Sequence, residues 1–137
     1  MAGTRPQPRF PEPDTQPFWD ATREHRLTYQ VDTTNGKPVF FPRTRSPYSG
    51  TDKLEWRESK GLGTVYSYSV VRLNRHPAFV DLGPYAIGFV DLDEGFRILT
   101  NIVGVANPVT DVKIGMRVKL KWEDQESGIS LPMFEPA

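Results

Sequence analysis

Four polar residues stand at positions where cysteines would form a metal site: Asp32, Asn35, Ser46 and Ser49. Two residues separate the members of each pair and ten separate the pairs, and cysteines in this pattern hold Zn²⁺ tetrahedrally. The chain has no cysteine, Asn and Ser are poor Zn²⁺ ligands, and one carboxylate supplies too few donors for Ca²⁺. We therefore predict no bound metal. We expect hydrogen bonds in its place, with Asx-turns at Asp32 and Asn35 and hydroxyl-to-backbone bonds at Ser46 and Ser49.

No pattern of catalytic residues emerges from the rest of the chain. The two histidines, His25 and His76, lie far apart in the sequence, and no nucleophile or metal-binding motif flanks them. Gly61-Leu62-Gly63 lacks the third glycine and the helix of a dinucleotide-binding loop. Three carboxylates gather at a predicted hairpin turn, where acidic side chains are usually only solvated: Asp91, Asp93 and Glu94. The sequence thus predicts a chain that is not catalytic by itself, with His76 as a candidate for contact with a ligand or partner.

The charge balance and the composition disfavour further classes of function. Seventeen basic residues against seventeen acidic ones give a net charge of zero in 137 residues, which offers no long-range attraction to a phosphate backbone. A dedicated nucleic-acid binder is therefore disfavoured. Thirteen prolines and eleven glycines favour turns and short strands over long helices. No apolar run approaches the roughly 18 residues of a membrane span, and the start lacks the apolar stretch of a signal peptide, so a cytoplasmic location is expected.

The elements that position these residues begin with an extended, proline-rich arm over residues 1–13. A helix is expected from about Pro17 to Leu27, since Pro17 suits a first helical turn. This helix carries adjacent aromatic residues, Phe18 and Trp19, and one helix cannot bury both rings against itself. Either ring packs on the chain's own body, or one of them anchors a partner, because aromatic and Arg side chains dominate interface hot spots.

Residues 14–53 combine this helix with a hairpin. The expected strands are Thr28–Asp32 and Val39–Pro42, joined by a turn at Asn35-Gly36 in which the glycine takes a positive φ. A unit with so little apolar content would ordinarily need a metal or a disulfide to stay folded. We therefore expect it to rest on a neighbouring part of the protein.

Residues 54–137 show the strand spacing of a small β-barrel. The predicted strands are Leu54–Glu58, Thr64–Val71, Tyr85–Leu92, Phe96–Val103, Met116–Trp122 and Ile129–Phe134. Tyr66 and Tyr68 are expected on one face of their strand, and Pro132 is expected to put the last strand at an edge. A long loop spans Arg72–Gly83, and the Ala106–Gly115 connection allows one helical turn at most. The predicted fold class is mainly β, with a barrel of five or six strands.

Short segments throughout the chain match one known family in order and spacing. They are Phe18-Trp19, Leu27–Gln30, Phe41–Arg43, Pro47, Leu54–Trp56, Gly61–Val71, Pro84-Tyr85, Asn101–Gly104, Ile114–Val118 and Leu131–Phe134. The chain resembles the DUF35 proteins, in which an N-terminal helix and a rubredoxin-like zinc ribbon precede an OB-fold. The resemblance covers nearly the whole chain after residue 10. It departs from the family at the four ligand positions, so the ribbon is expected to be degenerate and free of metal.

The resemblance implies a non-catalytic accessory subunit of a thiolase-fold enzyme, such as a thiolase or a lipid-transfer-protein-type aldolase that shortens steroid side chains. No cofactor is expected, and an acyl-CoA thioester is the implied ligand. An OB-fold binds on its barrel face and adjoining loops, which points to Tyr66, Tyr68, Arg72, Arg75, His76, Phe79 and Tyr85. The expected contacts with the partner enzyme are Phe18, Trp19, Arg23, Arg26, Phe41 and Arg43.

Two alternative functions stay open at this point. The same aromatic and basic residues could stack single-stranded nucleic acid, or the chain could be a freestanding acyl-CoA hydratase or thioesterase. A salt-sensitive gel shift with an oligonucleotide would favour the first alternative. Turnover of acyl-CoA by the isolated chain would favour the second.

Overall fold

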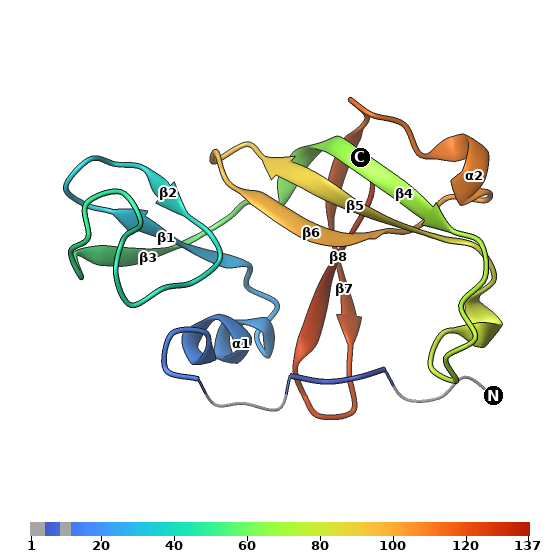
Figure 1. The fold of residues 1–137 in the computed structure, drawn as a ribbon, viewed down its shortest axis with the longest axis horizontal. Coiled ribbons are helices and arrows are strands. Elements are labelled where there is room, and N and C mark those ends of the chain that lie inside the picture. The colour runs from blue at the N-terminus through green and yellow to red at the C-terminus, as the bar shows by residue number, and fades with distance from the viewer. Residues whose placement is uncertain (1–4, 9–11) are drawn as a thin grey trace.

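A computed structural model of the chain describes residues 5–8 and 12–137. The chain forms a three-stranded sheet of order β2-β1-β3 and a closed barrel of order β4-β5-β6-β8-β7 (Figure 1). The fold is mainly β, and the barrel is of the OB type, as the sequence predicts. The rest of the predicted arm, residues 1–4 and 9–11, lies outside the described residues. Within the described part, no helix has the length and apolar character needed to cross a membrane.

The helix α1, Gln16–Thr22, is shorter than the sequence predicts. It carries a proline in its first turn and buries Phe18, Ala21 and Thr22. The prediction that it continues to Leu27 was wrong, because the chain reverses after Thr22 and His25 takes a left-handed φ of 55°. This reversal leaves the charged residues 23–26 in solvent and turns Leu27 into the core.

The three-stranded sheet contains β1, Thr28–Asp32, between β2, Pro38–Val39, and β3, Leu54–Glu58. All five residues of β1 are buried, and both neighbouring strands run antiparallel to it. The return strand was predicted over Val39–Pro42, but β2 is shorter and ends at Val39. The sequence also placed Leu54–Glu58 at the start of the barrel, but this strand pairs with β1 along its whole length, so it completes the ribbon sheet instead.

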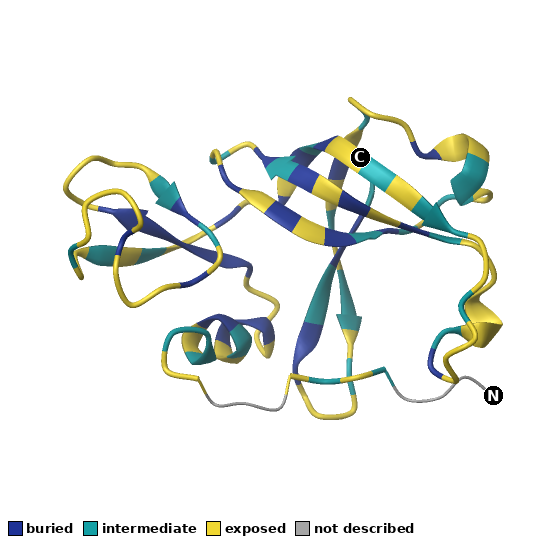
Figure 2. Cartoon of the chain, viewed as in Figure 1, coloured by how far each residue is buried: buried dark blue, intermediate teal, exposed yellow. Residues whose placement is uncertain are grey.

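The barrel strands are β4, Leu62–Val71; β5, Tyr85–Leu92; β6, Arg97–Ile102; β7, Arg117–Asp124; and β8, Ser130–Pro136. Two short helices, η1, Val80–Leu82, and α2, Pro108–Asp111, lie in the connections. The long strand β4 pairs with both β5 and β7. Buried and exposed residues alternate along β5 and β6 as bands (Figure 2), which gives the barrel an apolar interior around Val90, Val118 and Phe134.

A bulge in β4 overturns one prediction about its faces. The register of β4 against β5 shifts between Val65 and Ser67. Because the extra residue reverses the alternation of side chains, Tyr66 points outward and is 52% exposed, whereas Tyr68 packs against the core. The expectation that Tyr66 and Tyr68 share a face was wrong.

The barrel has a seam between β6 and β8. These strands are parallel and pair only at Ile102 and Phe134. Farther along, the Thr100 hydroxyl donates to the Pro132 carbonyl at 2.7 Å, so a side chain bridges the two strands there. The prediction that Pro132 marks an edge strand was wrong, since β8 lies between β7 and β6. The proline, which lacks an N–H group, lies in the part of β8 that has no ladder with β6.

Candidate functional site

The first knuckle of the ribbon is built around the carboxylate of Asp32, which is fully buried. Its Oδ1 accepts hydrogen bonds from the backbone N–H of Thr34 at 2.9 Å and from the Thr34 hydroxyl at 2.6 Å. Its Oδ2 accepts from the Ser49 hydroxyl at 2.6 Å and from the Asn35 amide at 3.3 Å. One carboxylate thus joins the two turns that a metal would join in a zinc ribbon.

The other polar positions bind neighbouring backbone groups. The Asn35 side chain accepts from the N–H of Lys37 at 2.9 Å, and the Ser46 hydroxyl accepts from the N–H groups of Tyr48 and Ser49 at 3.1 and 3.3 Å. The Ser49 hydroxyl accepts from the N–H of Thr51 at 3.4 Å. The Asx-turns and the hydroxyl-to-backbone bonds predicted from the sequence are therefore present.

These donors also set the charge state of the cluster. Hydrogen bonds from the hydroxyls of Ser46, Ser49 and Thr34 hold the pKa of Asp32 far below its usual range. The carboxylate therefore stays ionised although it is buried. Among the described residues, no group of three or more His, Cys, Asp or Glu side chains is arranged to hold a metal ion.

A groove of about 330 Å³ lies where α1, the ribbon and the barrel meet. Its lining is largely apolar and comes from α1, from the loop after β2, and from both strands of the seam: Thr15, Phe18, Trp19, Phe40–Pro42, Ile98–Asn101 and Leu131–Met133. Two of these side chains are prominent on the surface, because Phe41 is 58% and Leu99 is 54% exposed. An apolar concavity edged by exposed large side chains is typical of an interaction site.

The loop that carries Phe41 is held to the ribbon sheet by a buried glutamine. The amide of Gln30 donates to the carbonyl of Arg43 at 2.8 Å and accepts from the N–H of Arg43 at 2.7 Å. Because Gln30 lies on the central strand β1, the position of Phe41 depends on the ribbon sheet. The ribbon therefore supports the groove, although its polar cluster is not part of the lining.

The residues predicted to contact a partner differ in their exposure and in whether they line the groove. Phe41 lines the groove from an exposed position and Trp19 from a half-buried one, whereas Phe18 is buried and packs edge-on against Trp19 at 5.0 Å. Arg23 donates to the carbonyl of Ser127 in the same chain. The side chains of the two remaining predicted residues, Arg26 and Arg43, are exposed and do not line the groove.

The residues predicted to bind ligand fall into separate places. The loop between β4 and β5 brings His76, Phe79 and Tyr85 together: the Phe79 ring lies 5.6 Å from His76 and 6.0 Å from Tyr85, on which it stacks. We call these three rings the aromatic platform. The Asn74 side chain fixes the Tyr85 end of the platform by donating to the Tyr85 hydroxyl at 2.9 Å. Arg72 and Arg75 belong to the same loop and are exposed.

The two tyrosines of β4 do not join this platform. Tyr85 pairs with Val71, the last residue of β4, whereas Tyr66 lies near the middle of that strand. The Arg97 guanidinium covers the Tyr66 ring at 3.5 Å and also binds Asp91, while Tyr68 contributes to the core. The ligand site expected from the sequence is therefore reduced to one loop and the start of β5.

The remaining ionisable candidates have structural partners. His25 stacks on Trp122 and lies 2.6 Å from a carboxylate oxygen of Asp124. The prediction that the three turn carboxylates are only solvated was wrong, since Asp91 binds Arg97, Asp93 binds Arg117, and Glu94 accepts from Ser59. Binding to Arg117 lowers the pKa of Asp93. These groups stabilise turns and strand pairs.

The barrel side of the groove was not predicted from the sequence. Leu99 occupies an outward position of β6, and its partner across the ladder, Phe89, is also exposed. The signal was present as apolar residues at both alternating positions of the predicted strand 96–103, where one face of a surface strand is usually polar. Nothing local indicated that Pro132 and Met133 would line the same groove as Leu99.

Comparisons with known proteins agree with this architecture. The family model described as "ChsH2, C-terminal OB-fold domain" matches residues 56–123. A probable enoyl-CoA hydratase alpha subunit from Thermomonospora curvata is 35% identical over 134 residues, which are 97% of this chain. The chain spans only 40% of the length of that relative.

Two further relatives match over most of their own length. A DUF35 domain-containing scaffold protein from Methanocaldococcus jannaschii is 33% identical over 117 residues, or 81% of each chain. A solved structure described as "Ltp2-ChsH2(DUF35) aldolase" contains a chain that is 33% identical, with a TM-score of 0.83. The match covers 95% of this chain and 98% of that one.

Proposed function

Because the chain belongs to the DUF35 family, we propose that it is a non-catalytic accessory subunit that docks on a thiolase-fold enzyme acting on acyl-CoA thioesters. A relative described as a scaffold protein and a similar chain in an aldolase structure support this role. The partner in this proposal is a thiolase or a lipid-transfer-protein-type aldolase. The proposal keeps the cytoplasmic location expected from the sequence.

The groove is the observation that carries the proposal. It presents Trp19, Phe41 and Leu99 on one apolar surface, and aromatic side chains that lie in such a setting are common hot spots of protein interfaces. The outer face of the barrel extends this surface through Phe89 and Ile87, which are also exposed. A partner that covered this surface would bury side chains that are costly to leave in water.

The proposal gives the degenerate ribbon a role in docking. Asp32, Asn35, Ser46 and Ser49 stand at the lost ligand positions, and their hydrogen bonds hold the two turns in place of a metal. The sheet held in this way supplies Gln30, which fixes the loop of Phe41. The ribbon would then be retained for the shape it gives to the groove.

Binding to the partner tests the docking surface directly. Co-expression with the thiolase-like product of a neighbouring gene should yield a complex. The Phe41→Ala substitution should raise the dissociation constant of this complex by about 10- to 30-fold. Tyr48→Ala is a matched control, because Tyr48 is an exposed aromatic residue of the same ribbon that does not line the groove. Its affinity should stay within about twofold of the wild type.

Two results would overturn the docking proposal. One is wild-type affinity in the Phe41→Ala variant together with a loss in Tyr48→Ala. The other is a partner enzyme that is equally soluble and active with and without this chain.

The proposal also assigns the aromatic platform to the nucleotide part of an acyl-CoA. Phe79 stacked on Tyr85 offers an aromatic surface for adenine, and Arg72 and Arg75 in the same loop offer cations for phosphate groups. These features also suit single-stranded nucleic acid, but the exposed outer face of β5 and β6 carries Ile87, Phe89 and Leu99, and the net charge is zero. Separate titrations with coenzyme A and with an oligonucleotide of equal charge distinguish the two ligands, because the proposal predicts tighter binding of coenzyme A.

A hydratase activity of the isolated chain is the remaining alternative. The relative from Thermomonospora curvata bears a hydratase name, but the similarity extends over only 40% of that protein. We expect no turnover of an enoyl-CoA by the chain alone. Measurable hydration that is abolished by His76→Ala would contradict this expectation.

A further inference from the structure

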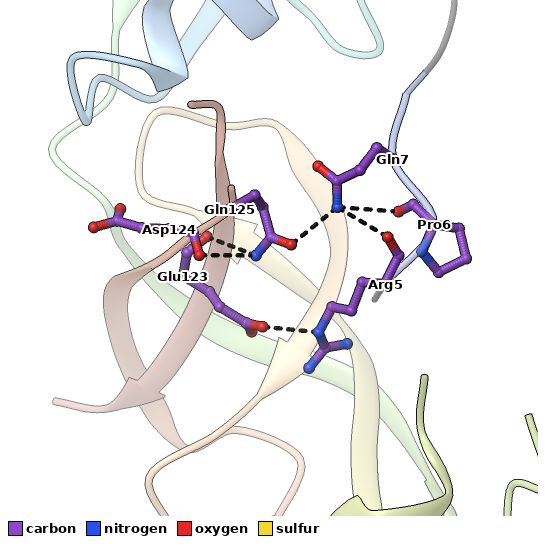
Figure 3. Close-up of polar contacts among 6 residues, drawn as sticks. All are labelled: Arg5, Pro6, Gln7, Glu123, Asp124 and Gln125. Carbon is purple, nitrogen blue, oxygen red and sulfur yellow. Dashed lines mark hydrogen bonds and ion pairs between the residues drawn. The ribbon is translucent and has the colours of Figure 1, made fainter. Parts of the chain in front are cut away.

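The N-terminal residues 5–8, which we call the strap, cross the end of the β7–β8 hairpin (Figure 3). The Arg5 guanidinium donates to the Glu123 carboxylate at 2.8 Å, and the Gln7 amide donates to the Gln125 side chain at 2.9 Å. The Ser127 hydroxyl donates back to Gln7 at 3.0 Å. Although the arm is rich in proline and lacks apolar periodicity, the Arg5 side chain is only 20% exposed. The strap is therefore bound to a defined place on the barrel.

The same guanidinium also covers the aromatic platform. It lies over the Phe79 ring, with its central carbon 5.3 Å from the ring centroid. The Phe79 ring also contacts the rings of His76 and Tyr85. Arg5 thus links three segments that are far apart in the sequence, namely the strap, the platform loop and the hairpin. It occupies part of the ring surface that a planar ligand would need for stacking.

We propose that the strap is a reversible cover of the platform, in which Arg5 occupies the ring of Phe79 until a nucleotide base displaces it. The inference rests on the proposed binding of the acyl-CoA nucleotide at this platform. Each contact of the strap is of a weak kind, namely one cation–π contact, a partly exposed ion pair and hydrogen bonds between neutral side chains. Ligand binding competes with the closed state, so the apparent dissociation constant equals the intrinsic value divided by the fraction of molecules that are open.

Two strap variants separate this competition from a direct role of Arg5 in binding. Arg5→Ala removes the cover, and Gln7→Ala weakens the strap without changing a charge or touching the ring. Isothermal titration of the full chain with coenzyme A should show affinity about three- to tenfold tighter for Arg5→Ala and about twofold tighter for Gln7→Ala. Arg45→Ala, which removes the same charge from the ribbon, should bind like the wild type. Unchanged or weaker binding in both strap variants would overturn the cover.

A spectroscopic readout follows the strap itself. The Nε–H of Arg5 is hydrogen-bonded to Glu123, so its resonance should be protected in the free chain and should move to a solvent-like position when coenzyme A binds. The signal is identified by its loss in Arg5→Ala. A resonance that stays bonded at saturating coenzyme A would show that ligand and strap do not compete.

Phe79→Ala separates failure of the cover from failure of the platform. If Phe79→Ala loses binding while the strap variants bind like the wild type, then coenzyme A binds at the platform but the strap does not compete with it. If Phe79→Ala binds coenzyme A as well as the wild type, the platform assignment fails and the cover fails with it. Docking on the partner enzyme is measured separately through Phe41, so neither outcome is confused with the accessory role.

Discussion

The ribbon sheet and the barrel are stabilised by different kinds of buried side chains. The barrel encloses side chains such as Val90, Val118 and Phe134, which are completely buried in its interior. The ribbon instead buries a carboxylate, Asp32, and surrounds it with donors. Since an unpaired buried charge is very costly, the ribbon is stable only while the hydrogen bonds of this cluster remain complete.

The ribbon also depends on the barrel for its apolar contacts. Tyr29 of β1 stacks on Phe96, which directly precedes β6, with ring centroids 4.6 Å apart, and the Phe40 ring lies 5.1 Å from the same ring. Both regions contribute to one core cluster. A sheet too small to build a core can therefore persist when a polar cluster fixes its turns and a larger neighbour supplies its apolar surface.

The largest effect is expected from a cavity in the barrel. Phe134→Ala should reduce the free energy of unfolding by about 3–5 kcal/mol, because it removes a fully buried ring. If the ribbon depends on the barrel, hydrogen exchange should accelerate in residues 28–58 as well as in 85–102. A ribbon that keeps its protection in this variant would show that the two regions are independent.

A smaller and local effect is expected at the polar cluster. Asp32→Ala leaves the donors of Thr34 and Ser49 without their acceptor, and we expect the melting temperature to fall by about 5–10 °C. Hydrogen exchange should accelerate in residues 28–58 and stay near the wild-type rate in residues 85–102. Asp52→Ala, which removes an exposed carboxylate from the same region, is the control and should change little. Equal losses in the two variants would contradict a special role for the cluster.

The smallest effect is a pH dependence that belongs to the ribbon. The pKa of Asp32 is lowered by its hydrogen bonds, so below the ordinary value of about 4 the unfolded chain takes up a proton that the folded chain does not. The stability from this group is present above pH 4 and is lost as the pH falls further. Asp93, Asp111 and Asp124 also have lowered pKa values and contribute to the total slope.

The contribution of Asp32 is isolated by comparing two proteins. Urea unfolding between about pH 6 and pH 2 should show a steeper acid loss in the wild type than in Asp32→Asn, which carries no ionisable group at this position. Parallel pH profiles would mean that Asp32 titrates alike in the folded and unfolded states.

Local patterns in the sequence predicted much of the fold. The strands Thr28–Asp32, Leu54–Glu58 and Tyr85–Leu92 have the predicted bounds, because alternation and flanking turn residues act within each segment. The pairing of Leu54–Glu58 was assigned to the wrong sheet, since pairing depends on contacts between distant segments. The face of Tyr68 was missed because no local signal marked the bulge before it.

The sequence alone predicts the turn chemistry of the ribbon, the absence of cysteine ligands and the positions of most strands along the chain. Each of these follows from residue types and short spacings, which need no knowledge of the partner segments. Only the tertiary structure decided which residues share a surface. It placed Leu99 and Pro132 beside Trp19 and Phe41 in one groove, and it brought Arg5 over Phe79. The physical reason is that strand register and the packing of the helix set these neighbours over separations of tens of residues, and such contacts form only when the whole chain folds.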